Sequence, residues 1–145
     1  MGLPEDGNRR QYGAMPDRAV TYQLWLHLAV DTELTVGALG RCTFPAGWYA
    51  YTGSAKRGLR ARLRRHSDPG AAKTLRWHAD YLLACPHATV HYVSLSAAPE
   101  CAVNAAVGGS LPCPGFGASD CRSGCGSHLR FLGPDFDLQA LAPAP

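Results

Sequence analysis

The stretch GWYAYTGSA, residues 47–55, decides what kind of fold this chain adopts. Its aromatic residues favour extended backbone, so residues 47–53 are predicted to form a strand that ends in the tripeptide YTG. The glycine and the small residues after it favour a turn. An arginine-rich segment follows, in which Arg62 and His66 are four residues apart and share one face of a predicted helix. The end of the strand and this helix can therefore bring a phenol, a guanidinium and an imidazole together.

Strand and helix patterns continue on both sides of this stretch. Residues 20–30 alternate as a strand does, with Tyr22, Leu24, Leu26 and Leu28 on one face. Further strands are predicted at 34–37, 40–44, 88–95 and 127–132. Helices are predicted at 57–67, 74–83 and 99–107. Short links between the first strands favour an antiparallel meander. The order of elements predicts an α+β fold, a small central antiparallel sheet flanked by helices.

Length and composition indicate one globular domain. The chain has 145 residues, of which 46% are hydrophobic and 17% charged, so disorder is excluded as its overall state. Residues 1–18 show no periodicity and are expected to be a flexible leader. The folded unit is expected at 19–134, and residues 135–145 are expected to be a C-terminal tail, either loose or weakly helical.

The basic residues are concentrated in one segment. The net charge is only +3, but residues 34–67 contain no Asp or Glu, and six of the 14 Lys and Arg residues lie between 56 and 65. Phosphate groups suit such a helix because arginine can bind them in a bidentate manner. A solvated basic face is the alternative. The candidate nucleic-acid contacts are Lys56, Arg57, Arg60 and Arg65.

Six cysteines leave several interpretations open. No secretory signal or membrane-length apolar run is present in the sequence, so a cytoplasmic protein with no membrane partner is expected. Its thiols are then expected to be free, buried or metal-binding rather than oxidised. One loop carries a set with near-ligand spacing, which is either a structural zinc site or a thiol cluster that holds the loop. This set comprises Cys113, Cys121, Cys125 and His128.

In these motifs the chain resembles the GIY-YIG endonuclease superfamily, and more closely its Uri-type branch. The matching pieces are TY at 21–22, YTG at 51–53, Arg62 with His66, WHADYLL at 77–83, EC at 100–101, GFGASDC at 115–121 and SHL at 127–129. The chain departs from the superfamily pattern in three places. VT replaces GI before Tyr22, the spacing from Tyr22 to Tyr51 is longer than usual, and Ser54 stands where many relatives carry lysine.

The resemblance implies a fold and a chemistry. It implies a GIY-YIG-like endonuclease that hydrolyses nucleic-acid phosphodiester bonds, with DNA the expected substrate and a DNA-repair protein a candidate partner. It assigns Glu100 to a divalent metal ion, Mg²⁺ or Mn²⁺. The catalytic residues that it implies are Tyr22, Tyr51, Arg62 and His66. A guanidinium and a metal ion neutralise phosphate charge, and they are expected to lower the pKa of a tyrosine that acts as a base.

The functional tyrosine and the function itself each have an alternative. Tyr49 points to the same strand face as Tyr51, so either could be the functional phenol. His78 and Asp80, two residues apart on a predicted helix, are interpreted as structural or partner contacts. The alternative functions are a non-catalytic nucleic-acid-binding module of the same fold, with zinc in the cysteine-rich loop, and an adaptor to a repair enzyme. A nuclease requires Tyr51, Arg62 and Glu100 to converge.

Overall fold

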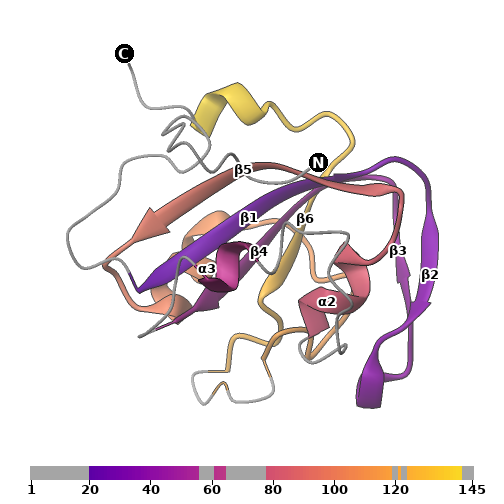
Figure 1. Cartoon of the computed structure of the whole chain (residues 1–145), viewed down its shortest axis with the longest axis horizontal. Coiled ribbons are helices and arrows are strands. Elements are labelled where there is room, and N and C mark those ends of the chain that lie inside the picture. The colour runs from indigo at the N-terminus through magenta and orange to yellow at the C-terminus, as the bar shows by residue number, and fades with distance from the viewer. Residues whose placement is uncertain (1–19, 56–60, 65–77, 119–120, 122–123, 142–145) are drawn as a thin grey trace.

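A four-stranded antiparallel sheet with the strand order β5-β1-β4-β6 forms the centre of the molecule (Figure 1). The computed structural model describes residues 20–55, 61–64, 78–118, 121 and 124–141. The strands of this sheet are β1 (Thr21–Leu28), β4 (Gly47–Ser54), β5 (Ala88–Ser96) and β6 (Leu129–Gly133). The predicted α+β class is confirmed. Among the described helices, none has the length and apolar character needed to span a membrane.

The register of β1 against β4 places the two halves of the candidate site next to each other. Tyr22 is paired with Gly53, and Leu24 with Tyr51. In antiparallel strands, directly opposed residues have their side chains on the same face. The Tyr22 and Tyr51 side chains are therefore near neighbours, although the two residues are far apart along the chain.

The long connection between β1 and β4 forms a hairpin of its own. It contains β2 (Thr32–Thr35), the 3-10 turn η2 (Gly37–Leu39) and β3 (Arg41–Phe44). The predicted meander is therefore wrong, because β1 pairs directly with β4 while β2 and β3 form a separate two-stranded sheet. A disulfide joins Cys42 of β3 to Cys113 and ties this hairpin to the loop before β6. The expectation that no thiol is oxidised is wrong for this pair.

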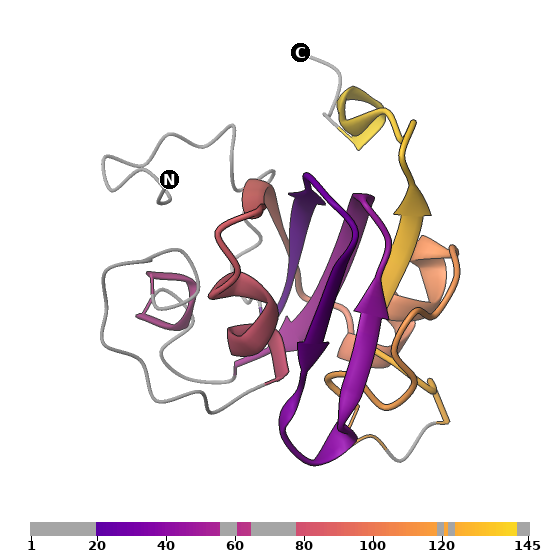
Figure 2. The ribbon, with the colours of Figure 1, turned by 90° about the vertical axis from the view of Figure 1, so that its right-hand side faces the viewer.

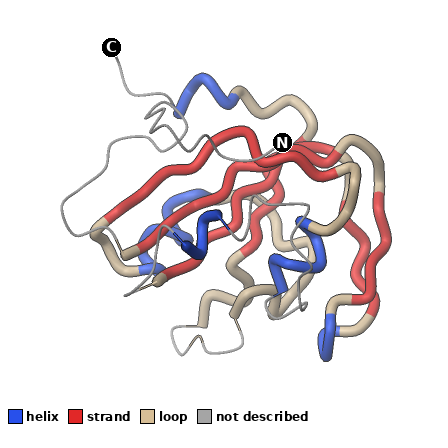
Figure 3. Tube along the Cα trace, viewed as in Figure 1, coloured by secondary structure: helices blue, strands red, loops and turns tan. Residues whose placement is uncertain are grey.

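Helices cover both faces of the sheet (Figure 2). The helix α2 (His78–Leu83) and the helical residues 61–64 lie on one side, and α3 (Glu100–Val107) lies on the other. Parts of the helices predicted at 57–67 and 74–83 lie outside the described residues. A long, largely irregular connection leads from α3 to β6, and a short 3-10 helix, η3 (Leu138–Leu141), follows the last strand (Figure 3).

The core lies between the sheet and α2. The four alternating residues of β1 are at most 2% exposed, as the sequence pattern predicts. They are Tyr22, Leu24, Leu26 and Leu28. Leu63 and Leu82 close this core from the helical side. Each fully buried leucine contributes roughly 1.5–3 kcal/mol to folding. On the opposite face, Trp25 stacks on Phe136 with ring centroids 5.8 Å apart.

Candidate functional site

Four residues from separate segments meet at the end of the sheet where β1 begins and β4 ends. They are Tyr22, Tyr51, Arg62 and Glu100. The rings of Tyr22 and Tyr51 have centroids 6.4 Å apart. The Arg62 side chain is hydrogen-bonded to Tyr22, and its Nη1 donates to the Ser54 carbonyl oxygen. Both Arg62 and Glu100 lie close enough to act electrostatically on the two phenols. The structure thus brings these sequence-predicted residues together.

Two glycines make room for these phenol rings. A Cβ atom on Gly53 would lie 2.5 Å from Cζ and from the hydroxyl oxygen of Tyr22. A Cβ atom on Gly117 would lie 2.9 Å from a ring carbon of Tyr51 and 3.2 Å from Cβ of His128. Gly117 also has a φ of +68°, a conformation that other residues rarely adopt. Both positions therefore require glycine for the phenols to sit where they do.

Glu100 opens α3 and connects the phenols to the loop before β6. Its carboxylate forms an ion pair with Nδ1 of His128 and a hydrogen bond with the Ser54 side chain. The Glu100 side chain is 24% exposed, whereas that of His128 is 2% exposed. Burial alone would raise the pKa of Glu100, but the His128 and Ser54 hydrogen bonds and the charge of Arg62 outweigh it and hold this pKa below its usual value. Glu100 is therefore a carboxylate at neutral pH.

The two phenols are less acidic than the sequence led us to expect. Burial raises the pKa of Tyr22 to about 12, although the charge and hydrogen bond of Arg62 act in the opposite direction. Burial raises the pKa of Tyr51 as well, and its neighbours Tyr22 and Glu100 add to this. The expected lowering by arginine occurs but is smaller than the desolvation effect. In this structure both phenols are protonated at neutral pH.

Tyr51, and not Tyr49, belongs to this cluster. The Tyr49 hydroxyl donates to the carbonyl oxygen of Pro45, and its pKa is raised by burial and by Asp31. Tyr49 instead packs against Phe131, with ring centroids 5.0 Å apart. Tyr49 and Tyr51 share a strand face, but two residues of extended backbone separate them by roughly 7 Å. That distance places only Tyr51 beside Glu100.

Three further residues support the site, and two of them, His78 and Asp80, were interpreted from the sequence as structural or partner contacts. Asp80 is fully buried in α2 and raises the pKa of both site phenols. His78 accepts a hydrogen bond from the Gly117 backbone N–H at 2.8 Å, which fixes the loop that borders Tyr51. Ser54 holds both Arg62 and Glu100. The sequence signal for Asp80 is a carboxylate that directly follows Ala79 in a largely apolar helical stretch.

Several predicted site residues lie outside the described part of the chain. His66, the second member of the predicted helical pair, is one of them. The four candidate nucleic-acid contacts are the others, namely Lys56, Arg57, Arg60 and Arg65.

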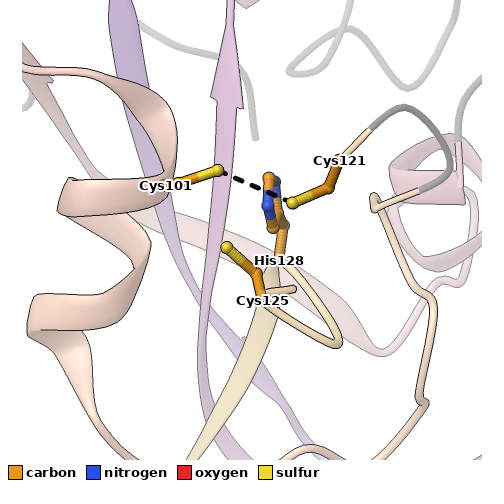
Figure 4. A group of neighbouring side chains, drawn as sticks. All are labelled: Cys101, Cys121, Cys125 and His128. Atoms are coloured by element: carbon orange, nitrogen blue, oxygen red, sulfur yellow. Dashed lines mark hydrogen bonds between the residues drawn. The ribbon is translucent and has the colours of Figure 1, made fainter. Parts of the chain in front are cut away.

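The cysteine-rich loop forms a second cluster beside Glu100 (Figure 4). Its members are Cys101, Cys121, Cys125 and His128, whose candidate ligand atoms all lie within 4.8 Å of one another. The predicted set had Cys113 in place of Cys101, and that member is wrong because Cys113 is bound to Cys42. Cys101 comes from the first turn of α3, whereas the other three residues come from the chain just before β6.

Comparison with known proteins identifies the family but no relative of known activity. No curated protein and no solved structure matches the chain. One family model, described as a domain of unknown function, DUF123, matches residues 21–142. This range contains every described strand and helix of the fold. The chain therefore belongs to the DUF123 family.

Proposed function

We propose that this domain is a divalent-metal-dependent endonuclease of the GIY-YIG type that hydrolyses phosphodiester bonds of DNA. One observation carries the proposal, namely the convergence of Tyr22, Tyr51, Arg62 and Glu100 at one end of the sheet. These residues come from β1, β4, the segment 61–64 and α3. A carboxylate, a guanidinium and two phenols provide the groups that phosphodiester hydrolysis needs.

Arg62 is placed where its guanidinium can neutralise phosphate charge. The Ser54 carbonyl and the Tyr22 side chain orient its guanidinium, so the group is held in place before a substrate binds. A guanidinium carries five N–H donors, and it can keep these contacts while it donates to non-bridging oxygens. A fixed donor of this kind stabilises the additional charge of the transition state.

Glu100 fits a magnesium or manganese ion. Mg²⁺ is commonly bound by one or two carboxylates together with water and substrate phosphates, and Glu100 supplies one partly exposed carboxylate. His128 pairs with one of its oxygens, Oε2, and the Ser54 side chain is hydrogen-bonded to the same carboxylate, so an ion would share this carboxylate with both contacts. Such an ion supplies charge stabilisation at the phosphoryl oxygen when bound.

Tyr22 and Tyr51 are protonated in this structure, which defines what they can do. A protonated phenol donates a hydrogen bond to water or to phosphate and orients it. Tyr22 accepts a proton from water only after its pKa falls from about 12. Positive charge close to the phenol acts in that direction, as Arg62 already does.

A cleavage assay tests the proposal. Duplex, single-stranded and branched DNA and matched RNAs are incubated with the full chain in Mg²⁺, in Mn²⁺ and in EDTA. We expect cleavage of DNA that EDTA abolishes. Arg62→Ala is expected to lower the cleavage rate about 10²–10³-fold, the usual cost of losing one charge-stabilising donor. Glu100→Gln removes the anionic ligand and is expected to abolish metal dependence together with activity.

Arg64→Ala is the matched control for Arg62→Ala. Arg64 lies two residues further along the same helical segment, and it is exposed. The control loses the same charge outside the cluster, so its rate is expected to remain within about threefold of wild type. Equal rates for wild type, Arg62→Ala and Glu100→Gln would refute the nuclease proposal.

A binding module without catalysis is the second candidate. It is favoured by the high pKa of Tyr22 and by the engagement of Glu100 with His128. This alternative predicts DNA binding that weakens with salt and needs no divalent ion. Binding that survives EDTA, with no cleavage under any condition, would support it.

A further inference from the structure

We propose that Cys101, Cys121, Cys125 and His128 bind one zinc ion, and that this ion fixes His128 against Glu100. The six cysteines divide into three groups. Cys42 and Cys113 form a disulfide, and Cys85 lies buried in the core. The other three cysteines are the members of the cluster with His128.

The spacing of the candidate ligand atoms suits tetrahedral zinc. Zinc–sulfur bonds of about 2.3 Å and zinc–nitrogen bonds of about 2.0–2.1 Å give ligand separations of roughly 3.5–3.8 Å. The Sγ atoms of Cys101 and Cys121 are 3.6 Å apart, within that range. All four ligand atoms lie within 4.8 Å of one another, so closing them around an ion takes shifts of about 1 Å, which rotations about side-chain bonds supply.

The donor set indicates a structural site. Three cysteines and one histidine complete a tetrahedron, which leaves no position open for water or substrate. The ligands come from two places in the chain that only the fold brings together, the first turn of α3 and the irregular segment before β6 (Figure 4). An ion there joins the helix to this segment.

Local backbone geometry already presents the ligands of this segment. Gly124 and Gly126, on either side of Cys125, have φ angles of +73° and +78°, which fold the chain back on itself. His128 donates its backbone N–H to the Phe116 carbonyl at 2.7 Å. Asn104 of α3 donates to the Ser127 carbonyl at 2.9 Å. Hydrogen bonds within the protein therefore hold the segment that carries Cys125 and His128.

His128 links the zinc cluster to Glu100. Its Nδ1 pairs with the Glu100 carboxylate, while Cys121 lies against the same ring, so Nε2 is the nitrogen assigned to the ion. The ion takes the place of a proton on Nε2, and Nδ1 stays paired with the Glu100 carboxylate. Carboxylates commonly support zinc-bound histidines in this way and strengthen metal binding about 10–100-fold. Glu100 and Cys101 are also adjacent, so the ion restrains Glu100 from two sides.

Metal reconstitution tests the proposal without reference to nuclease activity. The full chain is purified with reductant and without chelator, and its zinc content is measured by elemental analysis. We expect one zinc per chain. When Co²⁺ is substituted for zinc, the absorption spectrum is expected to show the intense visible bands of a tetrahedral site. A sulfur-to-cobalt charge-transfer band is expected in the near ultraviolet. The double variant Cys101→Ser with Cys125→Ser is expected to lose the metal.

Matched variants show which cysteines hold the ion. Cys85→Ala, and the double variant Cys42→Ala with Cys113→Ala, are expected to retain one zinc because these residues lie outside the cluster. Cys125→His keeps four ligands and is expected to retain Co²⁺ with a shifted spectrum, which makes the test independent of whether serine variants fold. Glu100→Gln is expected to weaken zinc binding about 10–100-fold.

Three outcomes would overturn the proposal. The first is a wild-type chain that takes up less than about 0.2 zinc per chain. The second is a Cys101–Cys121 disulfide in protein purified under reducing conditions. The third is undiminished zinc binding in the double variant Cys101→Ser with Cys125→Ser. Failure of the nuclease assay would leave all of these readouts intact, because each of them measures metal or thiol chemistry.

Discussion

The most direct test of how tightly the site is packed is the substitution Gly53→Ala. The φ angle of Gly53 is not in the left-handed region, so backbone conformation alone would make alanine acceptable or even stabilising by about 0.5–1 kcal/mol. The added Cβ, however, would lie 2.5 Å from both Cζ and the hydroxyl oxygen of Tyr22. Contact distances for such atoms are about 3.5–4.0 Å, so the gap is about 1 Å too small. The steric effect and the backbone effect therefore have opposite signs.

The surroundings prevent Tyr22 from moving away cheaply. Its side chain is 2% exposed, it is hydrogen-bonded to Arg62, and its backbone pairs with β4. Overpacking in such a core costs typically 1–3 kcal/mol. We expect the upper end, a loss of about 3 kcal/mol in the free energy of unfolding and a fall of roughly 10 °C in Tm. The cleavage rate is expected to fall as well, because the displaced phenol no longer holds Arg62.

Urea denaturation followed by tryptophan fluorescence measures the loss, and a double-mutant cycle assigns its cause. In a Tyr22→Leu background the Cζ and hydroxyl atoms are absent, so Gly53→Ala is expected to cost less by about 1–3 kcal/mol. A Gly53→Ala protein whose free energy of unfolding stays within about 0.5 kcal/mol of wild type would refute the reasoning. So would an equal cost in both backgrounds.

Because burial raises the folded-state pKa of Tyr22 to about 12 while the unfolded phenol titrates near 10, its stabilising effect is complete below pH 10 and is lost as the pH rises toward 12. Urea titrations should therefore show stability falling by up to about 1.4 kcal/mol per pH unit in that window, with a smaller slope in Tyr22→Phe. Tyr49→Phe should leave the cleavage rate within about threefold of wild type, whereas Tyr51→Phe should lower it about 10²-fold, and similar rates for the two variants would contradict the placement of the site. Protein in free zinc at about 1,000 times the Kd for zinc should be more stable by about 4 kcal/mol than protein in a zinc-selective chelator. An equal thermal midpoint of unfolding in both conditions would count against the proposed zinc site.

The candidate site was only partly predictable from the sequence. The spacing of Tyr51 and Arg62 indicated that a strand end and a helix present them together, and their side chains do lie in one cluster. The choice between Tyr49 and Tyr51 was not predictable, because period-two alternation assigns both to one face. Their positions along β4 separate them, since Glu100 lies near the end of that strand.

The acidity of the phenols was not predictable either. The sequence shows that arginines are near Tyr51 but not how much solvent reaches its ring. Desolvation is a property of the packed core, and here it exceeds the effect of Arg62 on the pKa of both Tyr22 and Tyr51. The buried carboxylate of Asp80 acts in the same direction.

The cysteines show the same division between local and distant information. Cys121, Cys125 and His128 were predicted as a group because they lie close together in the sequence. Their fourth partner lies 20 residues before Cys121 in the chain. Spacing along the chain could not distinguish Cys101 from Cys113. In the fold, the first turn of α3 brings Cys101 to the cluster, whereas Cys113 is bound to Cys42 of the β2-β3 hairpin.

The sequence by itself determined the type of the four strands of the main sheet and the face that β1 presents to the core. Hydrophobic periodicity is a local property, so the alternation of Tyr22, Leu24, Leu26 and Leu28 was enough to predict both the strand and its buried side. Only the tertiary structure decided that β1 pairs with β4 while β2 and β3 stand apart as a hairpin. Periodicity says which side of a strand is apolar but not which neighbour it bonds to. That pairing is what brings Tyr22 to Gly53 and assembles the candidate site.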